Sequence, residues 1–217
     1  MPNILDDPKS LYAEAFRTIK TNIKYALSNK NKKVILITSS QLEEGKSTIS
    51  SNLALSLSQD SKKVILVDCE LRRPTLHKHF RVSGMDGLTE AIIGEESIDK
   101  VKTRVNEYLD IIPSGHVPPN PVELLSSDGM DKIIKVLREE YDYVIMDTSP
   151  IGLVSDAQIL SAKSDGVILV LRNKKTKKDE LYNSKKLVEQ VGGNLIGMIL
   201  NRKEESRKLN YNYYNQR

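Results

Sequence analysis

The segment from Val34 to Thr48 constrains the fold of this chain more than any other part of the sequence. It begins with apolar, mostly β-branched residues typical of a buried strand, and it ends in the polar turn Gly45-Lys46-Ser47-Thr48, which opens a segment with helical character. At such a junction, backbone N–H groups and the helix dipole stabilise phosphate oxygens. The pattern predicts a phosphate-binding loop in which Lys46 contacts the β- and γ-phosphates and Ser47 ligates Mg²⁺.

The match to the usual G-x-x-x-x-G-K-[ST] pattern is incomplete, because Ser40 stands where the first glycine is expected. The alternative is an ordinary surface turn capped by Ser47. The strand before the turn and the helix after it favour the phosphate-binding interpretation.

Composition limits the class of protein. A chain of 217 residues with 39% hydrophobic and 29% charged residues is typical of one soluble globular domain. A net charge of +4 is too small to indicate nucleic-acid binding, and the single cysteine, Cys69, excludes an internal disulfide framework. No apolar run is long enough to cross a bilayer, and the first residues lack the features of a signal peptide, so we expect a cytoplasmic location.

Strands and helices are expected to alternate along the chain. Continuous apolar runs indicate strands buried on both faces, as in a parallel sheet covered by helices. We expect strands at 33–38, 63–68, 108–113, 143–147, 167–171 and 195–200, and helices at 8–29, 46–59, 87–93, 128–139 and 178–191, with a turn-rich loop at 114–121. This order predicts a single doubly wound α/β domain over residues 1–203, followed by a flexible tail at 204–217.

Acidic residues end two of the predicted buried strands. Asp68, with Glu70 close behind it, ends the second strand, and Asp147 ends the strand at 143–147. Because ligands of α/β sheets bind at the carboxyl ends of the strands, we expect these acids to lie beside the Lys46 loop. Asp147 resembles a Walker B acid, and Asp68 is a candidate metal-shell residue or proton acceptor.

Other candidate residues remain ambiguous from sequence alone. Asn201 and Arg202 follow the last strand, where an amide could reach an adenine base or simply form a polar turn. The basic run at 172–178 is either an anion-facing surface or a solvated loop. The histidines, at positions 77, 79 and 116, have no metal-binding spacing, and we interpret them as structural or surface residues.

The tail is rich in tyrosine. Three of the nine tyrosines, Tyr211, Tyr213 and Tyr214, lie in the last seven residues. On a mobile segment they are candidate docking anchors or phosphorylation substrates.

Together these motifs resemble the bacterial tyrosine kinases (BY-kinases) of capsule and exopolysaccharide synthesis, of the CpsD/CapB type. The resemblance covers essentially the whole chain. It rests on the Walker A loop at 39–48, the Val64–His77 segment similar to Walker A′, the Ile111–Leu125 segment, the Asp147-Thr-Ser-Pro150 Walker B and the terminal tyrosines.

The resemblance implies a P-loop NTPase fold of the ParA/MinD-like group and a protein-tyrosine autokinase that uses ATP and Mg²⁺. It implies nucleotide contacts from residues 44–48 and from Asn201 and Arg202, and catalytic roles for Lys46, Asp68, Glu70 and Asp147. It also implies that the tail tyrosines are phosphorylated by neighbouring protomers in a homo-oligomer ring. The ring would be built through Glu14-x-x-Arg17-x-x-Lys20, although this pattern is also typical of a solvated helix face.

Partners are implied in the same way. We expect a separate transmembrane adaptor of the polysaccharide co-polymerase type, which activates the chain and holds it at the inner face of the membrane. We also expect protein substrates with tyrosine and a cognate tyrosine phosphatase, but no nucleic acid.

The sequence departs from the family pattern at several positions. Leu42-Glu43-Glu44 stands in place of Pro-Gly-Glu, Glu70 in place of the second aspartate, and Lys20 in place of an arginine. Glu43 restricts the loop backbone where glycine is usual, and Lys20 lacks the planar guanidinium.

Two other functions compete with the kinase. A ParA/MinD-like ATPase switch shares the fold, but it carries a signature lysine where this chain has Gln41, and it gives the tyrosine tail no role. A non-catalytic scaffold would leave the strand-end acids without a function.

Overall fold

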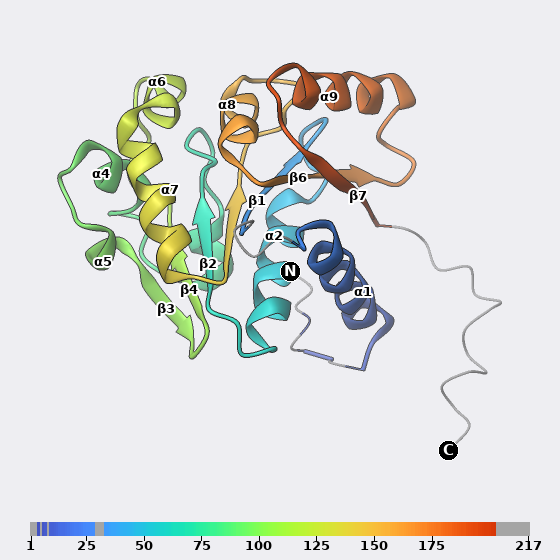
Figure 1. Cartoon of the computed structure of the whole chain (residues 1–217), viewed down its shortest axis with the longest axis horizontal. Coiled ribbons are helices and arrows are strands. Elements are labelled where there is room, and N and C mark those ends of the chain that lie inside the picture. The colour runs from blue at the N-terminus through green and yellow to red at the C-terminus, as the bar shows by residue number, and fades with distance from the viewer. Residues whose placement is uncertain (1–3, 5, 8, 29–32, 203–217) are drawn as a thin grey trace.

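The computed structural model describes residues 4, 6–7, 9–28 and 33–202, which form a seven-stranded sheet between two layers of helices (Figure 1). The strands are β1 (Val34–Ser39), β2 (Val64–Asp68), β3 (Thr103–Asn106), β4 (Leu109–Ile112), β5 (Tyr143–Asp147), β6 (Gly166–Arg172) and β7 (Leu195–Asn201). Their order is β3-β4-β2-β5-β1-β6-β7, and only the edge pair β3–β4 is antiparallel.

Helices cover both faces of the sheet. They are α1 (Leu11–Ala26), α2 (Lys46–Ser58), α3 (Leu76–Phe80), α4 (Leu88–Ile93), α5 (Ile98–Val101), α6 (Pro121–Ser126), α7 (Asp128–Glu140), α8 (Asp156–Lys163) and α9 (Lys178–Gln190). Alternate residues of β1 enter different cores: Ile35 packs in the cluster that contains Phe16 of α1, and Leu36 in the cluster that contains Ile133 of α7. This alternation is the expected consequence of a strand covered on both sides.

The central strands determine where the functional residues meet. All residues of β1 and β2 are buried, and the parallel pairing of β2 with β5 places Asp68 opposite Asp147. The pairing of β1 with β5 places Ile37 opposite the same Asp147, just before the phosphate-binding turn. The ends of three strands therefore meet at one edge of the sheet.

The doubly wound fold predicted from sequence is confirmed, and each predicted strand and helix overlaps one in the structure. Five elements were not predicted: α3, α5, α6, α8 and β3. The loop expected at 114–121 runs into α6, whose first residue is Pro121, a position where proline costs a helix little. In α8 the buried residues include Asp156 and Ser161, so the apolar period of a helix is hidden.

The helix α1 packs on α2 at the outside of the sheet (Figure 1). Its N-cap is Ser10, whose Oγ accepts a hydrogen bond from the Ala13 N–H at 3.1 Å. Its buried face includes Phe16 and Ile23, and its exposed surface is mostly polar, with Leu11 and Tyr25 as exposed apolar residues. In the described part of the chain, no helix combines the length and the apolar character that crossing a membrane requires.

One carboxylate joins the start of β1 to the turn before β6. Asp165 Oδ2 accepts hydrogen bonds from the backbone N–H groups of Lys33 (2.7 Å) and Val34 (2.8 Å) and from the Arg138 guanidinium (2.6 Å). Burial acts to raise the pKa of Asp165, but these hydrogen bonds outweigh it and lower the pKa.

We expect Asp165→Ala to reduce the free energy of unfolding by about 2 kcal/mol at neutral pH, because two backbone donors and a guanidinium lose their acceptor. The folded-state pKa lies below the unfolded one, so this stabilisation is present above the unfolded pKa and is lost as the pH falls through the folded value. Urea denaturation at pH 7 and pH 3 measures both effects. The control is Asp99→Ala, which removes a carboxylate that is 80% exposed. Equal losses in the two variants would contradict the assignment.

Candidate active site

The phosphate-binding turn leads directly from β1 into α2. Gly45 precedes the helix with a φ of 96°, a left-handed conformation that glycine adopts without strain. Lys46 is the first helical residue and is only 9% exposed, and Ser47 and Thr48 follow it in the first turn. The free N–H groups of this turn and the Lys46 ammonium provide the positive potential that a phosphate requires.

The absent first glycine is explained by the packing around Ser40. This residue is fully buried, and its Oγ accepts a hydrogen bond from the Ser184 Oγ of α9 at 2.9 Å. It is not among the described residues with positive φ, so the backbone there has no need of glycine. The residue that must be glycine is instead Gly152, which packs against Ser40. A Cβ at Gly152 would lie 2.4 Å from the Ser40 carbonyl oxygen.

Glu43 does adopt the conformation that the usual glycine would allow, with a φ of 61°. The loop is held in this shape by the basic segment after β6. Lys175 Nζ donates to the Leu42 carbonyl at 3.1 Å and to the Glu43 carboxylate at 3.3 Å, and Arg172 donates to the Glu43 carbonyl at 3.4 Å. Part of the basic run at 172–178 therefore supports the phosphate-binding loop.

Glu44 supports the loop from inside. Its buried carboxylate accepts hydrogen bonds from the Gln41 N–H at 2.9 Å and from the Thr176 hydroxyl. Its backbone carbonyl accepts from Asn201 Nδ2 at 2.9 Å, and the Asn201 Oδ1 accepts from the Arg202 N–H. Both polar groups of the Asn201 amide are thus engaged by the chain itself, and its contact with an adenine stays a prediction.

Two buried carboxyl groups face this loop. Asp68 is fully buried and accepts hydrogen bonds from the N–H groups of Glu70 (3.2 Å) and Leu76 (3.1 Å). Asp147 is 1% exposed, and its carboxylate oxygens make no well-formed hydrogen bond among the described residues, although the Ser47 and Ser50 hydroxyls lie close enough to lower its pKa. A buried carboxylate without a donor is costly unless a cation completes its environment.

Burial and neighbouring negative charges perturb both acids. Burial, with the charge of Asp147, raises the pKa of Asp68 to about 8. Burial also raises the pKa of Asp147 to about 6, and the nearby Lys46 ammonium opposes that shift. Strongly perturbed acids beside a phosphate-binding loop are typical of a functional site. The Asp147 carboxylate and the Ser47 hydroxyl, which lie close together, fit the oxygen ligands that Mg²⁺ requires.

Sequence reasoning missed a polar network behind these acids. Arg72 binds the buried Asp156 through two hydrogen bonds of 2.9 and 3.0 Å. Asp156 begins α8, and the Ser149 hydroxyl, 3.4 Å from it, donates to Glu70 at 2.8 Å. The predicted second acid, Glu70, is thereby oriented from the β5 side of the site. The position of Arg72 just after the second strand could have marked it as a candidate site residue. Nothing in the sequence indicates that it pairs with Asp156.

The predicted oligomerisation residues lie on α1 in two different environments. Arg17 forms an exposed ion pair with Glu14 on the helix surface. Lys20 turns toward its own chain, where Nζ contacts the Asp60 carboxylate at 2.8 Å and the Ser56 carbonyl at 3.0 Å. The role of these residues in a ring stays a prediction, and the tail tyrosines lie outside the described residues.

All three histidines were expected to be structural or surface residues. His77 is half-buried, His79 is exposed, and His116, also exposed, makes a polar contact. Its Nδ1 lies 3.0 Å from Glu90, and the nearest donor atoms of His116, Glu90 and Asp86 lie within 4.8 Å of one another. Glu90 also accepts from the Gly87 N–H at 2.7 Å. The Glu90 carboxylate is therefore already used to join α4 to the loop after β4.

The fold and this loop define a nucleotide-binding P-loop protein, and comparison with known proteins places it more narrowly. A family model described as AAA domain matches residues 32–192. The tyrosine-protein kinase YwqD of Bacillus subtilis is 41% identical over 211 residues, a match that covers 97% of this chain and 89% of YwqD. The chain therefore belongs to the bacterial tyrosine-protein kinases.

Solved structures agree. The chimerical protein CapA2B2 has a TM-score of 0.87 at 34% identity, covering 93% of this chain and 89% of its own. The kinase domain of the Escherichia coli tyrosine kinase ETK has a TM-score of 0.88 at 32% identity, covering 96% and 84%. MinD from Pyrococcus horikoshii, at 24% identity, shares the fold alone. The expected protein-tyrosine kinase class and P-loop fold are confirmed.

We expect Asp147→Asn to raise the Tm of the nucleotide-free protein by roughly 5 °C at pH 7, because it removes a buried charge. The folded-state pKa of about 6 lies above the unfolded value, so the native state binds the proton more tightly. The cost of ionisation therefore grows between pH 4 and pH 6 and is constant above. Thermal unfolding should show only a small difference in Tm between Asp147→Asn and the unmodified protein at pH 4, and the full difference at pH 7. A Tm no higher than that of the exposed-site control Asp99→Asn would contradict the assignment.

We expect Glu43→Gly to be more stable than Glu43→Ala by about 1 kcal/mol, since both lose the Lys175 contact and only glycine is unstrained at positive φ. Chemical denaturation of the two variants measures the difference. Equal stabilities would show that the loop does not hold the left-handed conformation in solution.

Proposed function

We propose that this chain is an ATP-dependent protein-tyrosine autokinase that phosphorylates its own tail tyrosines, Tyr211, Tyr213 and Tyr214, in trans. The observation that carries the proposal is the pair of buried carboxyl groups beside the Lys46 loop, one of which, Asp147, lies close to the Lys46 ammonium and the Ser47 hydroxyl. This arrangement is suited to a triphosphate with a bound divalent cation and not to a simple phosphate anion.

Each residue has a distinct role in the proposed reaction. Lys46 and the N–H groups of residues 44–48 hold the phosphates of ATP, and Ser47 and Asp147 would hold Mg²⁺, which neutralises charge on the transferred group. The tyrosine oxygen attacks the γ-phosphorus, the bond from that phosphorus to the bridging oxygen of ADP breaks, and ADP leaves. Asp68 accepts the tyrosine proton.

Asp68 is well suited to accept this proton. Its pKa of about 8 makes its carboxylate a stronger base than that of an exposed aspartate, and the positive charge of Mg²⁺ would favour the ionised form that accepts the proton. Its two oxygens are oriented by the N–H groups of Glu70 and Leu76, which leaves further lone pairs for a water or a hydroxyl. Glu70, held by Ser149, lies in the same acidic group and would orient water in the metal shell.

The cellular role follows from the resemblance noted in the sequence. We propose that the kinase regulates capsular or exopolysaccharide synthesis, and that a transmembrane adaptor activates it and holds it at the inner face of the membrane. Similarity to CapA2B2, whose name combines CapA with CapB, supports an adaptor partner. A homo-oligomer ring through Glu14, Arg17 and Lys20 and a cognate tyrosine phosphatase complete the proposal.

The test is to incubate the full chain with Mg²⁺, ATP and the cytoplasmic tail of the adaptor, and then to measure intact mass and map peptides. We expect phosphate on the tail tyrosines, and at least a hundredfold loss in Lys46→Met, because one charged phosphate contact is removed at the transition state. Lys132→Met, which removes an exposed lysine of α7, is the matched control.

Mixing two variants, neither of which can phosphorylate its own tail, tests transfer in trans. Lys46→Met keeps the tail but not the activity, and a variant with all three tail tyrosines changed to phenylalanine keeps the activity but not the acceptors. Phosphate on the Lys46→Met chain in the mixture would support transfer between copies. ATP hydrolysis without phosphotyrosine in the unmodified chain would instead favour the ATPase switch.

A further inference from the structure

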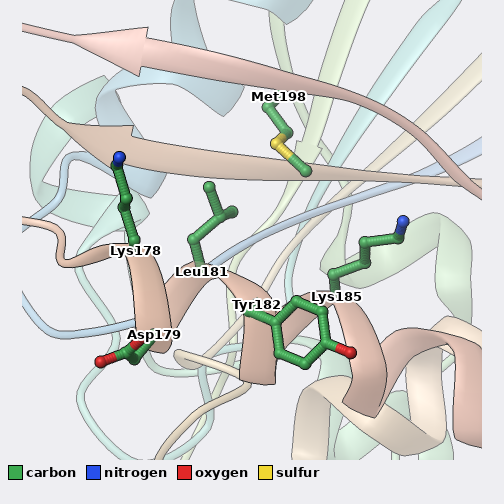
Figure 2. A pocket seen from close by; sticks show the side chains of 6 residues that line it. All are labelled: Lys178, Asp179, Leu181, Tyr182, Lys185 and Met198. Carbon is green, nitrogen blue, oxygen red and sulfur yellow. The ribbon is translucent and has the colours of Figure 1, made fainter.

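A groove of about 420 Å³ lies between α9 and the edge strand β7 (Figure 2). One face of α9 contributes residues at positions i, i+3, i+4 and i+7, which are Lys178, Leu181, Tyr182 and Lys185. Met198 of β7 faces them. In Figure 2 the side chains of Leu181 and Met198 lie between the two lysines, and Asp179 points away from Met198. The groove therefore has an apolar floor and a cationic group at each end.

The apolar residues here are open to solvent. Tyr182 is 69% exposed, and Met198 and Leu200 on β7 are 45% and 49% exposed. The strand β7 pairs only with β6, so its other edge has no partner in the described sheet. An apolar surface at an open sheet edge is typical of a binding site for an extended segment.

The charges indicate what kind of segment fits. Lys178 forms no ion pair within the described residues, and Lys185 has only an exposed contact of 3.6 Å with Glu189. Two available ammonium groups around an apolar floor suit a ligand that is both aromatic and anionic. Phosphotyrosine has this combination, with a ring for the floor and a phosphate for the lysines.

The chain carries its own candidate ligand directly after β7. Residues 204–217 contain three basic and two acidic residues, so the unmodified segment is not attracted to the lysines. Three phosphates would add about −1.5 to −2 charges each and reverse this balance. Tyr211 lies ten residues beyond Asn201, roughly 30 Å of extended chain, whereas Met198 lies about 10 Å back along β7.

We propose that the α9–β7 groove binds residues 204–217 of this chain once their tyrosines are phosphorylated. This goes beyond the proposed kinase activity and rests on it for the source of phosphotyrosine. The groove would then be a docking site for the reaction product, separate from the Lys46 loop.

The experiment measures binding of labelled synthetic peptides of residues 204–217 to the full, dephosphorylated chain by fluorescence anisotropy. We expect the peptide with phosphotyrosine at 211, 213 and 214 to bind at least about tenfold more tightly than the unmodified peptide. The double variant Lys178→Gln/Lys185→Gln should lose about that factor, whereas the exposed control Lys186→Gln should lose none. Circular dichroism confirms that each variant is folded.

Two further results separate the proposal from simpler explanations. A peptide with phosphoserine at the same three positions should bind several-fold more weakly, and Met198→Ala should reduce binding of the phosphotyrosine peptide alone. Equal binding of the phosphoserine peptide would show that the groove is only a basic surface, and equal binding of the unmodified peptide would show that the groove does not recognise the phosphate. Either result overturns the proposal, as does absence of binding. Because the peptides are synthetic, these outcomes are independent of whether the chain phosphorylates itself.

Discussion

The parallel pairing of β2 with β5 places two carboxyl groups, Asp68 and Asp147, side by side in the interior. Their position is set by backbone register, which the two hydrophobic cores fix from both faces of the sheet. Neither side chain can move into water without disturbing a central strand. The Lys46 loop is arranged around this fixed pair.

This arrangement costs stability in the absence of a ligand. A buried carboxylate loses its hydration, and a second one nearby adds repulsion, which together account for the raised pKa values of both acids. The Lys46 ammonium and the Ser47 and Ser50 hydroxyls offset part of the cost at Asp147. A bound cation would offset more of it, so the buried charge that costs folding stability would also favour binding of a metal–nucleotide complex.

The phosphate-binding loop depends on residues far away in the sequence. Its turn has a glutamate at positive φ, which contacts from the β6–α9 segment hold in place, and Ser184 of α9 binds the serine that replaces the usual first glycine. Thr176 and Lys175 bind the loop directly before α9 begins, and Asn201 binds it where β7 ends. The helix and strand that hold the loop are therefore the same two elements that form the groove with the flanking lysines.

Sequence patterns were sufficient for features that depend on local chemistry or on burial. Long apolar runs revealed the central strands, and the rule that strands of a parallel sheet end at one edge brought Asp68 and Asp147 to Lys46. Partners that meet only in three dimensions were beyond such reasoning. Arg72 and Asp156 are separated by 84 residues, and Asn201 and Glu44 by 157.

Sequence alone also does not show how the predicted oligomerisation residues on α1 are placed, because one of them has a partner that is distant in the sequence. Glu14, Arg17 and Lys20 have the spacing of one helix face, yet Lys20 is only 13% exposed in its side chain because it reaches across to Asp60 beyond the end of α2. That contact attaches α1 to its own domain, whereas Glu14 and Arg17 form an ion pair on the exposed surface of the helix. A lysine can make this intramolecular contact as a flexible point charge, whereas the usual arginine at this position would present a planar donor surface. In this chain Lys20 therefore makes an intramolecular contact with Asp60, whereas the charges of Glu14 and Arg17 stay on the surface.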